Sequence, residues 1–255
     1  MALVRPLWRA ASSRVVVVGG GIAGLTAALD LAAVGLPVTL VEEGPSIGGL
    51  MAQLDKTFPT NDCAMCILAP RLLEAARHPL IDIRTLTRVM GLEGRPGNFQ
   101  VLMARRPRYV DPARCTGCGE CVRVCPKRIP DPYNQGLSQT KAIHVPFPQA
   151  VPQAAYITPE ACRHLQGRKE TSCVQVCLAE AVNFEDQPET FVVEAGAVIL
   201  APGAIPAKVS DFPGAWHPDV VTSLEFERLL SASVPLASPP GCPSTLSSWP
   251  SGLSP

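Results

Sequence analysis

The stretch from Arg14 to Gly24 reads RVVVVGGGIAG, and it decides the fold of the first part of the chain. Residues 14–19 contain four consecutive β-branched valines, are too few for a helix and end in glycine, which predicts a buried parallel strand. Residues 22–34 carry apolar side chains at helical spacing, and a Gly-Leu-Pro stop follows them. Because a second strand comes next at residues 38–41, the sequence predicts a right-handed β-α-β unit.

The glycines of this stretch have the spacing of a dinucleotide-binding loop. Gly19 permits a tight turn, Gly21 lets the backbone approach a pyrophosphate, and Gly24 lets the helix pack close to the strand. The start of the helix offers free N–H groups and a positive dipole end to the anion. Glu42 ends the second strand, where a carboxylate accepts hydrogen bonds from ribose hydroxyls. We therefore predict dinucleotide binding rather than a plain glycine turn.

The dinucleotide is predicted to be FAD rather than NAD. Glu42 and Glu43 precede the pair Gly48-Gly49, which resembles the adenine-nucleotide region of flavoproteins of the pyridine nucleotide-disulfide reductase type. Residues 198–203, VILAPG, resemble the short segment with which such proteins re-enter the flavin domain. The expected FAD-binding residues are Gly19, Gly21, Gly24, Glu42, Glu43, Gly48, Gly49 and Gly203.

Ten cysteines are the most unusual feature of the composition. Four of them form a run with the spacing of a bacterial ferredoxin, Cys115-x2-Cys118-x2-Cys121-x3-Cys125-Pro126. The short spacings let three thiolates surround one [4Fe–4S] cluster, while the fourth cysteine binds the other cluster in two-cluster ferredoxins. Zinc is the competing metal, but the run fits poorly to two separated cysteine pairs. We therefore predict an iron–sulfur module.

This crossed ligation requires a second group of cysteines, which the chain supplies downstream. The first cluster is then expected to have four ligands: Cys115, Cys118, Cys121 and Cys177. Cys125 joins Cys162 and Cys173 at a second site that lacks one thiolate. Glu170 stands where the missing cysteine of a Cys-x2-Cys-x3-Cys pattern would be. Carboxylate ligation, a three-iron cluster and a lost cluster all stay open for that second site.

Cys63 and Cys66 lie outside this module, in the sequence DCAMC just after the flavin segment. A Cys-x2-Cys pair at the start of a helix, expected over residues 66–77, suits a redox dithiol with a lowered thiolate pKa. The pair would then be the catalytic residues. Two other interpretations stay open: ligands for a cluster of a neighbouring module, and buried structural thiols.

Charge and hydropathy exclude several classes of function. The 255 residues carry 22 basic and 22 acidic side chains, so nothing indicates nucleic acid or an acidic membrane surface as a partner. Residues 15–29 are apolar but broken by glycines and too short for a membrane span. The first thirteen residues lack an export signal, so we expect a reducing, cytoplasmic location. The four histidines show no ligand spacing, and Cys242 is expected to be incidental.

The chain is predicted to divide into an interrupted flavin domain, an insert and a tail. Residues 83–90 and 99–105 indicate a β-hairpin, and strand patterns resume at 190–194 and 197–201. Thr-x-x-Glu at Thr222 forms a capping box ahead of a last helix. The Ser- and Pro-rich tail is expected to be disordered. The predicted parts are residues 14–106 and 189–230 for the flavin domain, 107–188 for the insert, and 231–255 for the tail.

Several stretches together resemble the iron–sulfur flavoprotein (A) component of CoB–CoM heterodisulfide reductase and its bacterial relatives. They are GGGIAGLTAALDLA, VEEGPSIGGLMAQLDKTFPTNDCAMCIL, PRYVDPARCTGCGECVRVCP and VTSLEFERLL, in chain order between residues 19 and 230. The resemblance implies an α/β fold: a Rossmann-like, thioredoxin-reductase-like FAD domain interrupted by an inserted α+β ferredoxin-like domain. It also implies an oxidoreductase that transfers electrons in a multisubunit complex, where flavin-based electron bifurcation can occur and a partner subunit cleaves the disulfide.

The family also implies partners and shows where this chain departs from it. The expected partners are the other subunits of such a complex and an electron donor such as a hydrogenase, a dehydrogenase or ferredoxin. Family members are much longer, and the Gly-Asp dipeptide that closes their flavin site does not occur here. We therefore expect an incomplete flavin domain and a tail that is a truncation or reading-frame artefact.

Two further functions stay open on the sequence alone. One is a flavin-dependent disulfide reductase in which Cys63 and Cys66 face the flavin. The other is a ferredoxin-like electron carrier on a scaffold that does not hold FAD. Flavin content per chain separates the second of these from the others.

Overall fold

A parallel sheet of four strands forms the centre of the molecule. The computed structural model describes residues 12–207 and 220–231. The strand order is β13-β1-β2-β5, with all three pairs parallel. The strands are β1 (Val15–Val18), β2 (Val38–Val41), β5 (Ile81–Arg84) and β13 (Ala197–Leu200). Strand β1 is thus a central strand, as its continuous valine run predicts.

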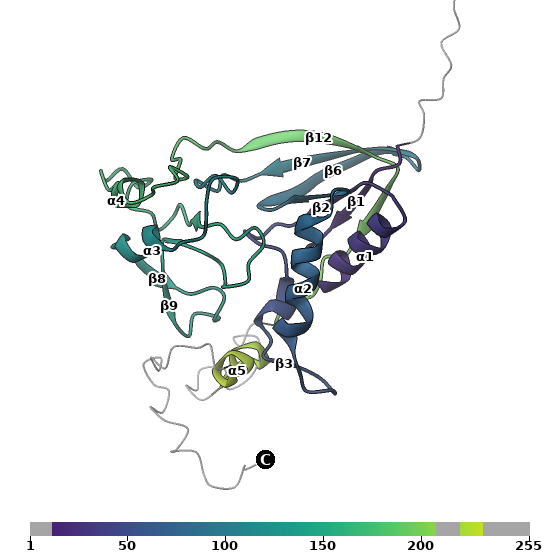
Figure 1. Ribbon diagram of the computed structural model, residues 1–255. Helices are drawn as coiled ribbons and strands as arrows, with labels where there is room; N and C mark the ends of the chain where they lie inside the picture. Colours follow the sequence, from purple (N-terminus) through teal and green to yellow (C-terminus); the bar gives the residue numbers. More distant parts are fainter. Residues whose placement is uncertain (1–11, 208–219, 232–255) are drawn as a thin grey trace, which may run out of the picture.

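Helices α1 (Ile22–Ala33) and α2 (Ala64–Arg77) cover one face of this sheet (Figure 1). Val15 and Val17 of β1 point to that side, because alternate residues of a strand face opposite sides. They pack with Leu25 of α1 and Leu68 of α2 in the largest core cluster. The predicted β-α-β unit is therefore confirmed.

An antiparallel sheet of three strands covers the other face, in the order β12-β7-β6. Its strands are β6 (Thr87–Arg95), β7 (Asn98–Arg105) and β12 (Glu189–Ala195). Val16 of β1 points to this side and packs against Val101, Met103 and Ala195. The layers in Figure 1 are therefore helices, parallel sheet and antiparallel sheet, an α/β arrangement as predicted.

The predicted strand over residues 83–90 is wrong as one element. Leu86 has a positive φ of 54°, which ends β5 and turns the chain into β6. Residue 83 therefore belongs to the parallel sheet, while the predicted hairpin forms between β6 and β7. The β-branched and apolar residues run on without a Gly or Pro between them, so the sequence gives no sign of this turn.

The chain leaves the antiparallel sheet after β7 and returns to it through β12, its direct neighbour. The segment between them, residues 106–188, is called the insert below. It lies to one side of the sheets in Figure 1 and has short elements only. These are α3 (Glu120–Val124), β8 (Arg128–Pro130), β9 (Gln139–Lys141), β10 (Ile143–His144), β11 (Tyr156–Ile157) and α4 (Ser172–Gln175).

The insert is fixed to the first part of the chain by two sets of polar contacts. Ile47 N–H donates to Val151 O at 3.0 Å, and Val151 N–H donates to the Ser46 hydroxyl at 2.9 Å. Arg108 is buried, and its guanidinium donates to Pro45 O, to Thr85 Oγ1 and to the carbonyl oxygens of residues 154 and 155. The two parts are therefore joined by backbone hydrogen bonds and by one buried cation.

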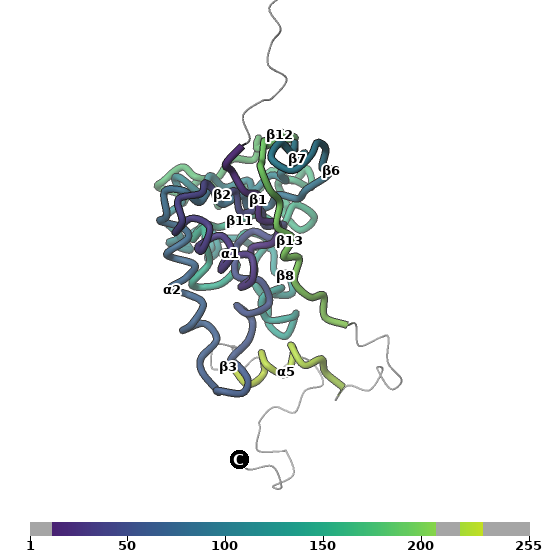
Figure 2. Tube along the Cα trace, turned by 90° about the vertical axis from the view of Figure 1, so that its right-hand side faces the viewer, coloured from purple at the N-terminus to yellow at the C-terminus, as the bar shows by residue number. Residues whose placement is uncertain are grey.

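The last helix, α5 (Ser223–Leu230), begins with the predicted capping box at Thr222, which is confirmed. It contacts the 3-10 helix η1 (Gly49–Gln53), and Glu227 Oε2 accepts from Asp55 N–H at 3.0 Å. Figure 2 shows α5 below the body, beside the hairpin of β3 (Lys56–Thr57) and β4 (Asp62–Cys63). None of the described helices has both the length and the apolar character that a bilayer crossing requires. The tail beyond residue 231, with Cys242, lies outside the described residues, and so does His217.

Candidate functional site

A pocket of about 520 Å³ opens at the carboxyl ends of the parallel strands. Open α/β sheets bind their ligands in the crevice at these ends. Five residues that the sequence assigns to FAD line it: Gly19, Gly21, Glu42, Gly49 and Gly203. The other three expected residues lie elsewhere. Gly24 is buried inside α1, Gly48 is buried, and Glu43 is exposed outside the pocket.

The three glycines of the loop have different surroundings. A Cβ on Gly24 would lie 1.9 Å from Gly19 O, so only glycine lets α1 pack this close to β1. Gly19 has a φ of 110°, in the region that favours glycine, and a Cβ there would lie 2.0 Å from Ala201 O. A Cβ on Gly21 would meet only Gly49 Cα, at 3.9 Å. The fold thus requires glycine at two positions, while the third is open to the pocket.

The start of α1 is available to an anion. No side chain among the described residues caps it, since its N-cap is Gly21. The N–H groups of the first turn and the positive end of the helix dipole are therefore free to meet a phosphate group. This is the position at which the glycine spacing predicts the pyrophosphate.

Glu42 holds the loop together and lines the pocket. Its Oε2 accepts from Gly20 N–H at 2.8 Å, and its Oε1 accepts from Gly44 N–H at 2.7 Å. A carboxylate has about four acceptor positions, so both oxygens retain capacity for hydroxyl donors. Glu43, by contrast, accepts through its backbone carbonyl, from Arg106 Nη2 at 2.8 Å. The pocket geometry therefore favours Glu42 over Glu43 as a ribose ligand.

The insert supplies the opposite wall of the pocket, which sequence reasoning missed. Tyr133, His144, Phe147 and Tyr156 line it. The rings of Tyr133 and Phe147 stack with centroids 5.3 Å apart, and the Tyr133 hydroxyl donates to Ala52 O at 2.9 Å. Burial lowers the pKa of His144, which keeps its imidazole neutral. A signal was present, since Tyr133 and Phe147 each follow a proline, but nothing in the sequence relates them to the glycine loop.

Arg228 of α5 contacts the residues that form this wall. It is 1% exposed, and its guanidinium carbon lies 4.4 Å from the centre of the Tyr133 ring. Its Nε donates to Asn134 Oδ1 at 3.0 Å, and its Nη1 donates to Gln53 O at 3.2 Å. The last described helix thus fixes both η1 and the insert beside the pocket.

The cysteines of the insert gather around one core cluster of Val110, Ile143, Ala155 and other small apolar side chains. The pKa of Cys121 is raised to about 12, first by burial and then by the nearby Cys115, Cys173, Cys118 and Cys177. The three other cysteines expected at the first site, Cys115, Cys118 and Cys177, therefore all lie near Cys121. Only Cys118 among these thiols is exposed.

The remaining cysteines form a second group. The pKa of Cys173 is raised to about 11, first by burial and then by Cys162 and Cys125. Cys125, Cys162, Cys173 and Glu170 also line one small cavity. Hydrogen bonds from Ser172 lower the pKa of Glu170, so its carboxyl group is ionised at neutral pH. The structure thus brings together the residues expected at the second site.

The thiols of the insert are of the ligand type that iron–sulfur clusters use. Within residues 12–207 and 220–231, no three His, Cys, Asp or Glu side chains are grouped as they would be around one metal ion. A [4Fe–4S] cluster takes each thiolate on a different iron, so its ligands stand farther apart than those of one ion. The thiols expected at the first site, those of Cys115, Cys118, Cys121 and Cys177, are free.

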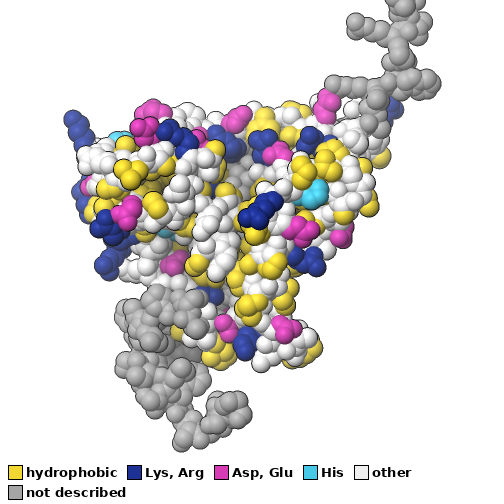
Figure 3. Space-filling view, viewed as in Figure 1, with side chains coloured by type: hydrophobic (Ala, Val, Ile, Leu, Met, Phe, Trp, Pro, Cys, Tyr) yellow, Lys and Arg dark blue, Asp and Glu magenta, His cyan; other side chains and the backbone are white. Residues whose placement is uncertain are grey.

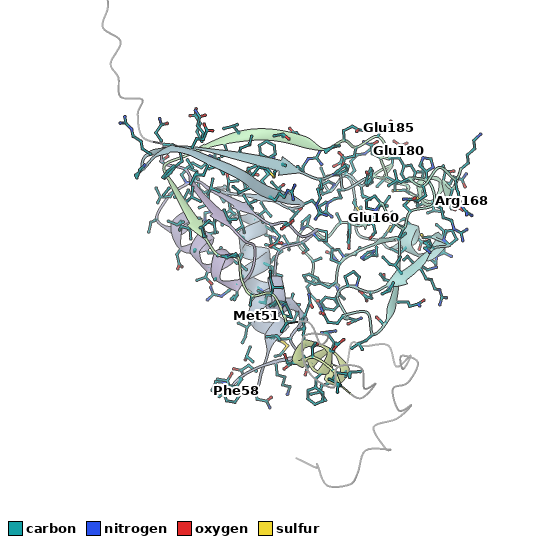
Figure 4. All side chains as sticks on the ribbon, turned by 180° about the vertical axis from the view of Figure 1, so that it is seen from behind. Met51, Phe58, Glu160, Arg168, Glu180 and Glu185 are labelled. Atoms are coloured by element: carbon teal, nitrogen blue, oxygen red, sulfur yellow. A yellow bond between two sulfur atoms is a disulfide. The ribbon has the colours of Figure 1, made fainter. Side chains whose placement is uncertain are left out.

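Cys63 and Cys66 form a disulfide at the start of α2. Cys63 is the N-cap, and its sulfur accepts from Cys66 N–H at 3.1 Å. Both are exposed, which contradicts the alternative of buried structural thiols, and neither lines the pocket. Exposed apolar side chains lie near the disulfide, and Figure 3 shows them as yellow atoms over α2. Phe58, at the tip of the β3–β4 hairpin, is 97% exposed (Figure 4).

Comparisons with known proteins agree with this geometry. A family model described as pyridine nucleotide-disulphide oxidoreductase matches residues 13–235. The A component of the H(2):CoB-CoM heterodisulfide,ferredoxin reductase of Methanothermobacter marburgensis is 43% identical over 225 residues, 87% of this chain and 33% of that protein. The iron-sulfur A 2 component of the CoB--CoM heterodisulfide reductase of Methanopyrus kandleri is 45% identical over 227 residues, 88% of this chain and 34% of that protein. The resemblance seen in the sequence is confirmed, and the chain spans about a third of the length of these curated relatives.

Among solved structures, the thioredoxin reductase of T. acidophilum aligns with 76% of this chain and 78% of its own length. The identity is 13% and the TM-score is 0.32. With so low a score, the fold assignment rests on the strand order and the family match instead.

Proposed function

Because the chain belongs to the pyridine nucleotide-disulphide oxidoreductase family, we propose that it is an electron-transferring flavin and iron–sulfur segment of the kind found in the A component of heterodisulfide reductases. One observation carries this proposal: the insert that holds the grouped cysteines also forms a wall of the dinucleotide pocket. A flavin in that pocket and clusters in the insert would both contact the same segment of the chain. Electrons would then pass between them within this chain.

FAD would be held by the groups that line the pocket. Gly21 and the start of α1 would receive the pyrophosphate, and Glu42 would accept from ribose hydroxyls. Tyr133 and Phe147 offer an apolar wall to the cofactor. FAD supplies the ability to take up an electron pair and to pass its electrons on singly, and the protein tunes it by position, charge and burial.

A [4Fe–4S] cluster would be held by Cys115, Cys118, Cys121 and Cys177. Cys121 is partly buried against the apolar core cluster, and solvent exposure is one factor that sets the potential of such a cluster. We propose that the flavin domain comprises residues 14–106 and 189–230. Residues 107–188 would then be an inserted ferredoxin-like domain.

The names of the relatives suggest the setting of this electron transfer. They are subunits of heterodisulfide reductases whose names include hydrogen, ferredoxin and F(420)H(2). We propose that this chain likewise works with other subunits and receives electrons from a hydrogenase, a dehydrogenase or ferredoxin. Flavin-based electron bifurcation here, with the disulfide reduced on a partner subunit, belongs to the same proposal.

Anaerobic purification followed by cluster reconstitution tests the proposal. The product should show broad iron–sulfur absorption that dithionite bleaches, together with a flavin spectrum. Replacing Cys121 with Ser should remove the absorption of the first cluster and leave the flavin bound. A colourless, iron-free product with native circular dichroism would refute it.

The disulfide at Cys63 and Cys66 favours a second candidate, a flavin-dependent disulfide reductase. The pair is exposed at a helix start, where a thiolate is stabilised and a substrate thiol has access. The double variant Cys63→Ser, Cys66→Ser should then abolish dithiol-linked turnover while iron and flavin contents stay unchanged. Unchanged turnover in that variant would remove this candidate.

A further inference from the structure

One cavity of the insert combines three thiols with a carboxylate. Its wall includes Cys125, Cys162, Cys173 and Glu170, and it shares no residue with the dinucleotide pocket. These thiols are the ones that remain once the first ferredoxin-type set is complete. Glu170 stands at the place in the sequence where the fourth thiolate is missing. It also lines the same cavity as the three thiols.

The side chain of Glu170 is held with one oxygen engaged and one available. Ser172 N–H donates to Glu170 Oε1 at 3.2 Å, and the Ser172 hydroxyl contacts the same oxygen. Within the described part of the chain, no residue donates to Oε2. Because Ser172 begins α4 and Cys173 follows in the same helix, the carboxylate and one thiol are positioned together.

A carboxylate is a harder ligand than a thiolate, and it binds iron through oxygen. An iron held by a carboxylate in a cluster of otherwise thiolate-bound irons is therefore the one that leaves most readily. We propose that Glu170 is the fourth ligand of a second [4Fe–4S] cluster, with Cys125, Cys162 and Cys173, and that its iron is exchangeable. This inference rests on the proposed function only in holding that the insert binds clusters.

The exchange has a defined electron balance. One-electron oxidation of the second cluster releases the Glu170-bound iron as a ferrous ion and leaves a three-iron cluster on the three thiolates. The electron passes to the added oxidant, ferricyanide. Ferrous iron and one electron from dithionite reverse the step, so the second cluster interconverts between two forms.

The test is a ferricyanide titration of the reconstituted full chain under anaerobic conditions. Ferrous iron is measured with a chelator, and the three-iron form is measured by its electron paramagnetic resonance signal. We expect one ferrous ion per chain to be released as the three-iron signal appears, and both changes to be reversed by ferrous iron and dithionite. The variant Glu170→Cys should lose this release, and Glu170→Gln should carry the three-iron cluster from the start.

The matched control is Glu185→Gln, which changes an exposed carboxylate on the same insert (Figure 4) and should titrate like the unsubstituted chain.

Iron release that persists in Glu170→Cys, or a four-iron second cluster in Glu170→Gln, would overturn the inference. If Cys162→Ser leaves the iron content unchanged, the second cluster does not assemble and the inference fails while the proposed function stands. An iron-free chain would instead overturn the proposed function. Flavin content and circular dichroism confirm that each variant is folded.

Discussion

At the scale of single residues, substitutions at Gly21 and Gly24 should have different effects, the first on FAD binding and the second on stability. A Cβ on Gly21 meets only ordinary contact, whereas a Cβ on Gly24 would overlap Gly19 O. Gly21→Ala should weaken FAD binding by roughly tenfold or more, equivalent to about 1.4 kcal/mol, with an unchanged free energy of unfolding. Gly24→Ala should lower the free energy of unfolding by about 2–3 kcal/mol, as overpacking does. Flavin fluorescence titration and urea denaturation measure the two effects, and equal losses of stability would contradict the assignment.

Glu42 and Glu43 form a natural matched pair. Glu42 lines the pocket and Glu43 is exposed outside it. Glu42→Gln removes the charge that strengthens hydrogen bonds to ribose hydroxyls, a loss of roughly 1.5–3 kcal/mol. The dissociation constant for FAD should therefore rise about 10- to 100-fold, while Glu43→Gln leaves it unchanged. Isothermal titration calorimetry measures both, and an equal effect of the two substitutions would remove Glu42 from its assigned role.

The raised pKa of the Cys121 thiol makes the stability of the cluster-free chain depend on pH. Its pKa is raised from 9.0 to about 12, so the folded state favours the neutral thiol. The resulting stability is fully present below pH 9 and is lost as the pH rises towards 12. In urea unfolding of cluster-free protein, the stability advantage over Cys121→Ala should therefore shrink between neutral pH and pH values above the ordinary thiol pKa. A constant difference between the two proteins across this range would contradict the raised pKa.

At the scale of elements, Arg108 joins the insert to the first part of the chain. Its buried guanidinium donates to Pro45 O, Thr85 Oγ1 and two carbonyl groups of the insert. Burial lowers the pKa of Arg108 to about 10, which leaves it charged at neutral pH. Arg108→Met leaves these acceptors without a donor and should cost roughly 3 kcal/mol of unfolding free energy. Arg168→Met, on the exposed outer end of the insert (Figure 4), should change it by no more than about 0.5 kcal/mol.

Elements also show which parts of the site the sequence could predict. The glycine loop, Glu42 and the cysteine groups follow local patterns, so their places in the fold could be predicted from short windows. The pocket wall of Tyr133 and Phe147 was not, because these rings reach the glycine loop only through contacts across about a hundred residues. The bracing by Arg228 depends on the same kind of contact. The turn at Leu86 was missed because a positive φ at leucine leaves no mark in the sequence.

At the scale of the whole molecule, the interruption of one sheet by one insert explains how two redox centres would meet. Strands β7 and β12 are neighbours, so the insert leaves and returns at the same edge of the fold. Its aromatic residues then close the pocket that the parallel strands open. The chain spans about a third of the length of its curated relatives. Cofactor binding by this chain and its enzymatic activity without other subunits are therefore tested separately.

The most direct test of flavin binding beside the clusters is the FAD content of the chain, measured after anaerobic purification and incubation with excess FAD. We expect one FAD per chain, released on denaturation and bound more weakly in Gly21→Ala. A folded chain that carries its iron–sulfur clusters but binds no FAD would contradict the shared pocket.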